Sequence, residues 1–124
     1  MAIALDPNRT WDYVLEAERD LPASEQTVFK LRALKPAELA EVADSGFIHY
    51  RSGTEIRATP AKQVLLTLRA GLLGWAGFKK ADGSTLEPPA SADERIAYLP
   101  EDVRIEIASE IRFGGQMTTT EGNS

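Results

Sequence analysis

The chain contains no cysteine, only one histidine (His49) and no long uninterrupted apolar run. Without cysteine it can form no disulfide and no thiolate metal site, and it has no thiol nucleophile. No apolar segment approaches the ~18 residues that a membrane-spanning helix needs. The opening residues, MAIALDPNRTW, carry neither a basic start nor a long apolar stretch, so we expect no signal peptide.

Basic residues are outnumbered as well, with 14 lysines and arginines against 19 acidic residues and a net charge of −5. A protein that binds the nucleic-acid backbone needs a basic face to displace counterions. The basic residues along positions 51–69 and at Lys79 and Lys80 have acidic residues among them. The composition therefore argues against nucleic-acid binding.

At 124 residues the chain has the size of one domain. Hydrophobic residues make up 43% and charged residues 27%, which is typical of a globular protein. Positions 115–124 are small and polar, so we expect one α+β domain over residues 1–114, followed by a polar tail.

The N-terminal part shows two alternating segments. In TWDYVLEAER apolar residues occupy every second position from Trp11 to Ala17, which is typical of a half-buried strand. A helix capped by Thr10 is the alternative, because this segment also contains good helix formers. In TVFKLRAL, Phe29 and Leu31 alternate with charged residues. The polar loop DLPASEQ between the two segments favours a hairpin.

A short helix and a second hairpin are predicted next. KPAELAEVADSG places Pro36 at the first helical position, puts Leu39, Val42 and Ala43 on the inner face and ends at Gly46. FIHYRSGTEIRAT then alternates on both sides of a Ser52–Gly53 turn.

The strongest helix signal covers TPAKQVLLTLRAGLLGWAGF, residues 59–78, with Thr59 as N-cap and Pro60 at the first turn. Its main apolar stripe has helical spacing and consists of Ala61, Val64, Leu65, Leu68, Leu72 and Trp75. We therefore expect a long central helix that is covered on most sides.

The C-terminal part predicts a capped turn and a final helix. Ser91 and Glu94 have capping-box spacing, and Pro100 precedes a helix that ends at Gly114. The inner face is expected to carry Val103, Ile107 and Ile111, with Ile105 and Ala108 beside them. The predicted fold is thus a small antiparallel sheet of two hairpins, packed on the long central helix and the C-terminal helix.

The segment GLLGWAGFKKADG, residues 71–83, is the main candidate for a ligand loop. Asp82 is the only side-chain oxygen ligand just ahead of Gly83, and two lysines would repel a cation, so calcium is excluded. The glycine spacing matches neither a dinucleotide loop nor a P-loop. We expect instead that Gly71 and Gly74 allow close backbone approach and that Trp75 and Phe78 are core residues. Asp82–Gly83 is then a turn.

Catalytic residues are not identifiable. His49 has no recognisable nucleophile or acid partner, and the neighbouring carboxylates have ordinary surface or helix-start positions, Glu16 with Glu18, Glu38 with Glu41 and Glu101 with Asp102. We expect no enzymatic activity, no cofactor and no metal site.

Three segments together resemble a family of small proteins encoded in the structural gene clusters of tailed bacteriophages. They are DPNRTWDYVLEAERDLPASEQTVFKLRALKPAE, LRAGLLGWAGFKKADGS and LPEDVRIEIASEI, within residues 6 to about 112. The family's Pro-Phe after the Asp-Gly turn is replaced here by LEPPAS. The matching positions are Asp6, Pro7, Thr10, Trp11, Leu21, Pro22, Gln26, Gly71, Leu72, Gly74, Trp75, Phe78, Asp82 and Gly83.

The resemblance implies a tail assembly chaperone or related morphogenesis protein, which binds a tail tube or tape measure protein in the host cytoplasm without catalysis. The alternative is a structural component of the head, neck or tail that stays in the virion. A homo-oligomer is compatible with both. A phage hydrolase or nuclease and a host regulator are further alternatives with less support. The candidate partner-binding residues are Trp11, Tyr13, Phe29, Trp75, Phe78, Lys79 and Lys80.

Overall fold

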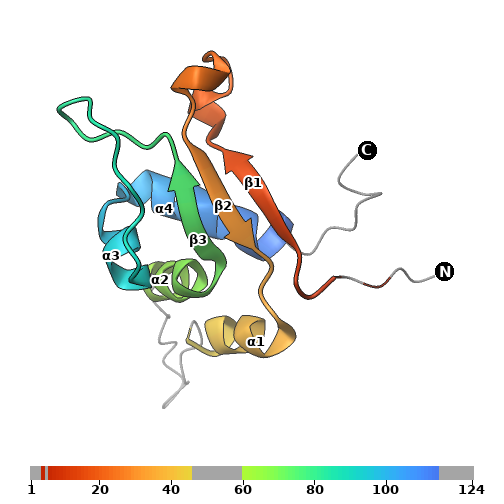
Figure 1. Ribbon diagram of the computed structural model, residues 1–124. Helices are drawn as coiled ribbons and strands as arrows, with labels where there is room; N and C mark the ends of the chain where they lie inside the picture. The colour runs from red at the N-terminus through yellow and green to blue at the C-terminus, as the bar shows by residue number, and fades with distance from the viewer. Residues whose placement is uncertain (1–3, 5, 46–59, 115–124) are drawn as a thin grey trace.

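A computed structural model describes residues 4, 6–45 and 60–114 of the chain, and Figure 1 shows how their elements are arranged. A three-stranded sheet lies in front of the C-terminal helix, and the other helices border the sheet on one side and below (Figure 1). In chain order the strands and helices are β1 (Thr10–Val14), β2 (Val28–Arg32), α1 (Pro36–Ser45), α2 (Pro60–Gly71), β3 (Leu72–Ala76), α3 (Ala92–Ala97) and α4 (Glu101–Ser109). Three helical turns add η1 (Glu16–Glu18), η2 (Ala23–Glu25) and the π turn η3 (Glu110–Gly114).

The predicted N-terminal hairpin is confirmed. β1 and β2 pair antiparallel, with Trp11 opposite Leu31 and Tyr13 opposite Phe29. The helical alternative for residues 10–19 is wrong, because the chain is extended to Val14 and only η1 follows as a short turn. The predicted alternation of β2 is observed, because Phe29 and Leu31 are fully buried and Lys30 between them is exposed.

The expected long helix is wrong in its second half. α2 ends at Gly71, and the next five residues form β3, which pairs antiparallel with β2. Leu72 lies opposite Leu31 and Trp75 opposite Phe29, with a register shift between them. Pairing with the open edge of β2 satisfies backbone groups and buries both side chains, which outweighs their helical spacing because propensity is a weak preference. The described sheet therefore has three antiparallel strands in the order β1–β2–β3.

The second predicted hairpin, His49 and the polar tail lie outside the described residues, as do Thr59 and Gly46. Within the described chain, a small hairpin follows β3 instead. Leu86 donates its backbone N–H to the Phe78 carbonyl at 2.7 Å, and Lys79 pairs with Thr85. The predicted Asp82–Gly83 turn closes this hairpin, with Gly83 at φ 88° and the Asp82 carboxylate accepting from the Ser84 backbone at 2.9 Å.

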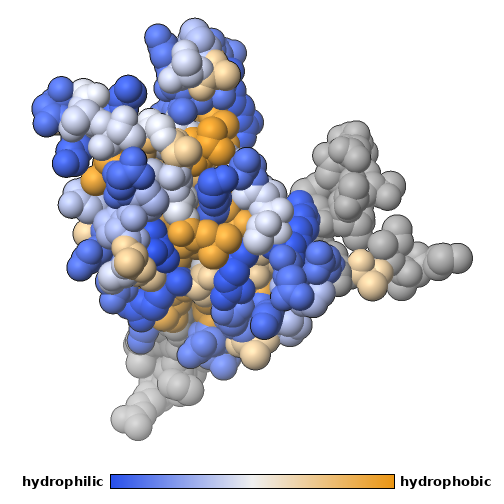
Figure 2. All heavy atoms as spheres, viewed as in Figure 1, coloured by the Kyte–Doolittle hydropathy of each residue, from blue (hydrophilic) through white to orange (hydrophobic). Residues whose placement is uncertain are grey.

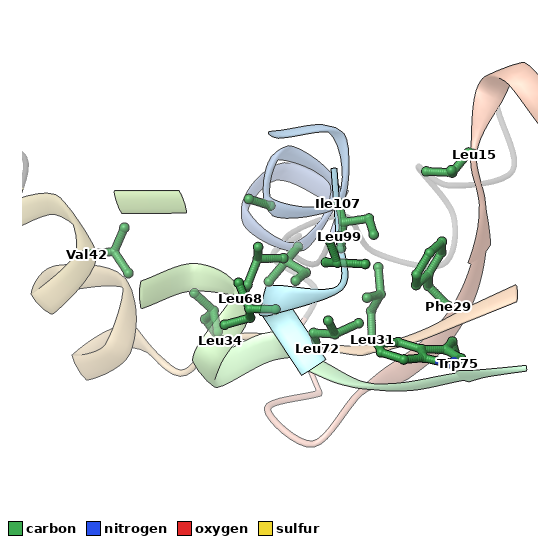
Figure 3. Close-up of a cluster of buried hydrophobic side chains, with 13 residues drawn as sticks. Leu15, Phe29, Leu31, Leu34, Val42, Leu68, Leu72, Trp75, Leu99 and Ile107 are labelled. Carbon is green, nitrogen blue, oxygen red and sulfur yellow. The ribbon is translucent and has the colours of Figure 1, made fainter. Parts of the chain in front are cut away.

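The hydrophobic core lies between the sheet and the helices (Figure 3). Phe29, Leu31, Leu72 and Trp75 enter it from the strands, and Leu68 enters it from α2. Helix α2 packs against α1, α3 and α4. It is not covered on most sides, however, because Ala61 and Leu65 of the predicted stripe are exposed.

The glycines of the GLLGWAG segment have different roles. A Cβ atom on Gly71 would lie 2.6 Å from Cγ2 of Ile111, so this glycine admits a side chain of η3 and not a backbone. At Gly74 the nearest atom to such a Cβ belongs to Pro88, at 3.6 Å. The expectation of close backbone approach is therefore wrong for both positions.

The segment after the Asp–Gly turn is held by one arginine. Arg95 in α3 donates through Nη1 to the carbonyls of Pro89 and Ala90, both at 2.9 Å, and through Nη2 to that of Leu72 at 3.3 Å. Ser91 caps α3 as predicted, its hydroxyl accepting from the Glu94 N–H at 3.5 Å. The path of this segment therefore depends on α3 and the start of β3.

Helix α4 begins after Pro100, as the sequence predicts. Ile107 and Ile111 are buried and Val103 is half-buried, which confirms the inner face. The expected position of Ile105 beside this face is wrong, because 52% of its surface is exposed.

Candidate functional site

Two of the predicted partner-binding aromatics lie inside the protein. Phe29 has no exposed surface and Trp75 has 4%. Together with half-buried Phe78 they form a cluster of edge-to-face rings with centroids 5.2 to 6.3 Å apart. The indole Nε1 of Trp75 donates to the Leu86 carbonyl at 2.8 Å, so its polar end is bound within the chain. These rings act as core packing, and neither Phe29 nor Trp75 offers surface to a partner.

Trp11 and Tyr13 are half-buried between β1 and the C-terminal helix, which lies behind the sheet in Figure 1. Nε1 of Trp11 donates to Glu110 at 3.2 Å, and the Tyr13 hydroxyl donates to Glu106 at 2.6 Å. Burial, and then the hydrogen bond to Glu106, raise the pKa of Tyr13 far above its usual value. The two aromatic residues thus fasten β1 to α4 and η3.

Lys79 and Lys80 are exposed on the small hairpin after β3. The Lys80 backbone N–H donates to the Ser84 carbonyl at 2.8 Å, which fixes the hairpin and leaves both side chains on the surface. The outer face of the sheet is also largely polar, and Figure 2 shows hydrophilic residues there around a smaller hydrophobic area. Lys30 and Asp12 pair across this outer face at 3.6 Å.

Two of the carboxylates that the sequence groups in pairs, Glu18 and Glu38, have structural partners. Glu18 accepts from the Thr27 backbone at 2.7 Å. Glu38 accepts from both terminal nitrogens of Arg32, and this hydrogen bonding lowers the pKa of Glu38 below its ordinary value. In the described part of the chain no three acidic or histidine side chains are grouped so that they could hold a metal ion.

A surface that the sequence analysis missed lies on the outer side of α2, α4 and η3. We call it the helical contact face and define it by three exposed apolar residues, Leu65, Ile105 and Phe113, with 38%, 52% and 63% of their surface exposed. Ile105 is shared by two adjoining hollows between α2 and the C-terminal helix, so the three residues belong to one surface.

The first hollow has a volume of about 170 Å³ and an apolar lining. Ala61, Val64, Leu65 and Ile105 form its sides, and Glu101 and Arg104 stand at its rim. The second hollow, of similar volume, is bordered by Arg112 and Phe113 at the other end of the face. Charges of both signs, Glu101 and Arg104, therefore border the first hollow, and Arg112 is the charged residue of the second.

The sequence did contain a signal for this face. In an α-helix a residue two positions from Ile107 points away from it, because each residue turns the chain by about 100°. Ile105 therefore had to lie opposite the inner stripe of Ile107 and Ile111. A large apolar residue on the polar side of an amphipathic helix indicates a contact surface.

None of the fourteen positions behind the family resemblance lines either hollow, and several of them serve the fold. Gln26, for example, donates its side-chain amide to three carbonyls of the preceding loop, including that of Leu21 at 3.0 Å. None of the helices in the described ranges is long and apolar enough to cross a bilayer. Comparison of the chain with protein-family models, curated proteins and solved structures found no match.

Proposed function

We propose that this protein works without catalysis, by binding other proteins during the assembly of a tailed-bacteriophage particle. In this proposal the helical contact face is the surface that a tail protein covers, and the protein acts as a tail assembly chaperone. The observation that carries the proposal is the exposure of Leu65, Ile105 and Phe113 on one surface.

A partner that covers the helical contact face would gain free energy, because the folded chain leaves apolar area there in contact with water. Burying an apolar side chain of this size contributes ~1.5–3 kcal/mol, and the most exposed residues have the most to gain from a partner. Phe113 is an aromatic residue next to Arg112, a combination that is enriched at the centres of protein interfaces. A hollow between two helices is also a common place for a partner's apolar side chain.

The phage context rests on the resemblance of residues 6 to about 112 to the morphogenesis family. The resemblance supports a role in particle assembly, because the family's members are encoded among structural genes. The binding surface is a separate inference from burial, and it differs from the aromatic residues of β1 and the 75–83 segment that the sequence had indicated.

A structural virion component is the second candidate. One observation favours it: the helical contact face carries opposite charges at its two ends, which suits a symmetric contact between identical subunits. The copy number in purified particles distinguishes the two roles. A stoichiometric band would support the structural component, and its absence together with binding to an unassembled tail protein would support the chaperone.

Binding is tested by co-expression with the tail tube and tape measure proteins of the same phage. We expect the wild type to retain one of them and Phe113→Ser to lose it. Tyr98→Ser is the matched control, since Tyr98 is a similarly exposed aromatic residue, 52% exposed, outside both hollows. Equal retention by wild type and Phe113→Ser would contradict the proposed surface.

A further inference from the structure

The geometry points to a second copy of this chain as an occupant of the helical contact face. We propose that two copies associate through antiparallel packing of their C-terminal helices about a two-fold axis. This inference rests on the proposed function's assignment of the helical contact face as a protein-binding surface. Because the second copy and a tail protein would both cover Phe113, they would occupy the face in turn.

The helical contact face contains both a protruding residue and a hollow of matching size. Phe113 is the most exposed of the large apolar residues in the described chain, with 63% of its surface accessible. The hollow beside Ile105 encloses about 170 Å³ and is lined mainly by apolar side chains. A cavity of about 150 Å³ accommodates a benzene ring, so the phenyl group of Phe113 fits this hollow.

Phe113 and the hollow beside Ile105 lie at opposite ends of the C-terminal helix. Phe113 lies in η3, and Glu101 marks the hollow at the start of α4, twelve residues earlier. Twelve residues of helix span roughly 18 Å. When two such helices lie antiparallel, the protruding residue of each copy meets the hollow of the other, and both contacts form together because a two-fold interface repeats every contact.

Charged residues at the two ends of the C-terminal helix bear on the orientation of the two copies. Arg112 precedes Phe113, and its guanidinium carbon lies 5.4 Å from the centre of the phenyl ring. Glu101 stands at the rim of the hollow, and Asp102 is next to it. Antiparallel packing brings the Arg112 of each copy to the acidic start of the other copy's α4, whereas parallel packing would place like charges together. The antiparallel orientation is therefore the one that pairs Arg112 with Glu101 and Asp102, with Arg104 beside them.

Arg104 is the remaining charged group at the rim. Its Nε donates to the Leu99 carbonyl at 2.8 Å, which holds the guanidinium beside the hollow. An aromatic ring that enters the hollow would lie next to this cation, an arrangement that aromatic rings favour. Ile105 of each copy would lie close to the two-fold axis.

The length of the two paired helices limits the surface area that the dimer buries. The segment Glu101–Gly114 has fourteen residues and is roughly 21 Å long. Two helices of this length bury an area at the lower end of the range for specific interfaces. We therefore expect a reversible dimer with a dissociation constant on the order of micromolar.

Sedimentation velocity of the full chain from about 1 to 300 µM tests the inference, since that range brackets a micromolar constant. We expect the wild type to change from monomer to dimer, and Phe113→Ser to dissociate roughly thirtyfold more readily, as for a central interface residue. Tyr98→Ser should dimerise like the wild type. A wild type that stays monomeric, or a dimer that Phe113→Ser leaves intact, would overturn the inference.

Charge reversal gives a test that is independent of side-chain removal. Glu101→Arg and Arg112→Glu should each be monomeric, because each creates two like-charge contacts across the axis. An equimolar mixture of the two variants should form a heterodimer, in which both pairs are again opposite in charge. Circular dichroism of each variant checks that the fold is kept. If the mixture of folded variants stays monomeric, the antiparallel arrangement is wrong.

The two proposals can fail separately. A wild type that remains monomeric but retains a tail protein through Phe113 would overturn the dimer and keep the proposed function. A dimer that depends on Phe113 in a protein that no virion protein binds, and that is missing from particles, would keep the dimer and overturn the proposed function.

Discussion

The two sides of the C-terminal helix differ in how far their apolar residues are covered. Ile107 faces the sheet and has no exposed surface, whereas Ile105, only two residues earlier, is 52% exposed. On the inner side the polar atoms of Trp11 and Tyr13 are also bound, by Glu110 and Glu106. The difference teaches that the inner side is complete as folded, while the outer side has apolar surface that the described chain does not cover.

Substitutions on the two sides of the helix should therefore differ in their effects on stability and on binding. Residues of the inner side should affect the free energy of unfolding and have little direct part in binding, and residues of the helical contact face should do the opposite. Four substitutions test this statement, and they are ordered from the largest expected loss of stability to the smallest.

Phe29→Ala should have the largest effect. It removes a fully buried ring that packs edge-to-face with Trp75 and Phe78, and leaves a cavity between sheet and helices. We expect the free energy of unfolding to fall by about 3–5 kcal/mol, measured by urea denaturation. A loss below about 1 kcal/mol, the range of surface changes, would mean that this core is not packed as described.

Gly71→Ala should have the next largest effect. The new methyl group would lie 2.6 Å from Cγ2 of buried Ile111, so η3 must move away from α2. We expect a loss of about 1–3 kcal/mol by the same measurement. Gly74→Ala is the matched control, because its methyl group would meet Pro88 at an ordinary 3.6 Å. Equal effects at the two glycines would contradict the close contact between α2 and η3.

Glu38→Gln should cost about 1 kcal/mol near neutral pH, because it weakens a charge-assisted contact with Arg32. The hydrogen bond from Arg32 is the main reason that the pKa of Glu38 lies below its ordinary value of 4.5. A lowered pKa in the folded protein means that the carboxylate stabilises the fold above pH 4.5, and that this contribution is lost as the pH falls through the folded-state pKa.

The difference in unfolding free energy between wild type and Glu38→Gln should therefore be constant above about pH 5.5, where Glu is ionised in both states, and shrink below pH 4.5. Urea denaturation at a series of pH values measures it. A difference that grows toward acid pH would have the wrong sign for this contact. Arg32 and Glu38 are 28% exposed, so the contribution remains modest.

Phe113→Ser should have the smallest effect on stability, within about 0.5 kcal/mol, because its ring is mostly exposed. The same substitution is expected to weaken binding at the helical contact face strongly. Thermal unfolding of a dilute, monomeric sample measures the first quantity without a contribution from association. A loss comparable to that of Phe29→Ala would remove the distinction between the two sides of the helix.

The sequence predicted the parts of the fold in which local patterns and final burial agree. The alternation of Phe29 and Leu31 with charged residues gave β2, and the turn chemistry of Asp82–Gly83 gave the small hairpin. It failed at Leu72–Ala76, where helical spacing continued but the edge of β2 was available for pairing. That edge is formed by residues about forty positions away, so no local pattern reveals it.

The candidate surface was predictable only in part. The position of Ile105 opposite the inner stripe follows from helical geometry alone. The burial of Trp75 was predicted, but Trp75 and Phe29 were also named as partner-binding candidates, because aromatics are common both in cores and at interfaces. The roles of Glu106 and Glu110 as acceptors for β1 require the sheet and α4 to be side by side, which only the three-dimensional arrangement shows.

The π turn at the end of the C-terminal helix has a consequence for the direction in which Phe113 points. A π turn contains more residues than an α turn, so each residue advances less around the axis. Ile111 can then remain against Gly71 while Phe113 comes round toward the line of Ile105. With ordinary α winding, Phe113 would lie eight residues and so about 80° around the axis from Ile105, and the π turn therefore keeps its ring closer to the line of Ile105.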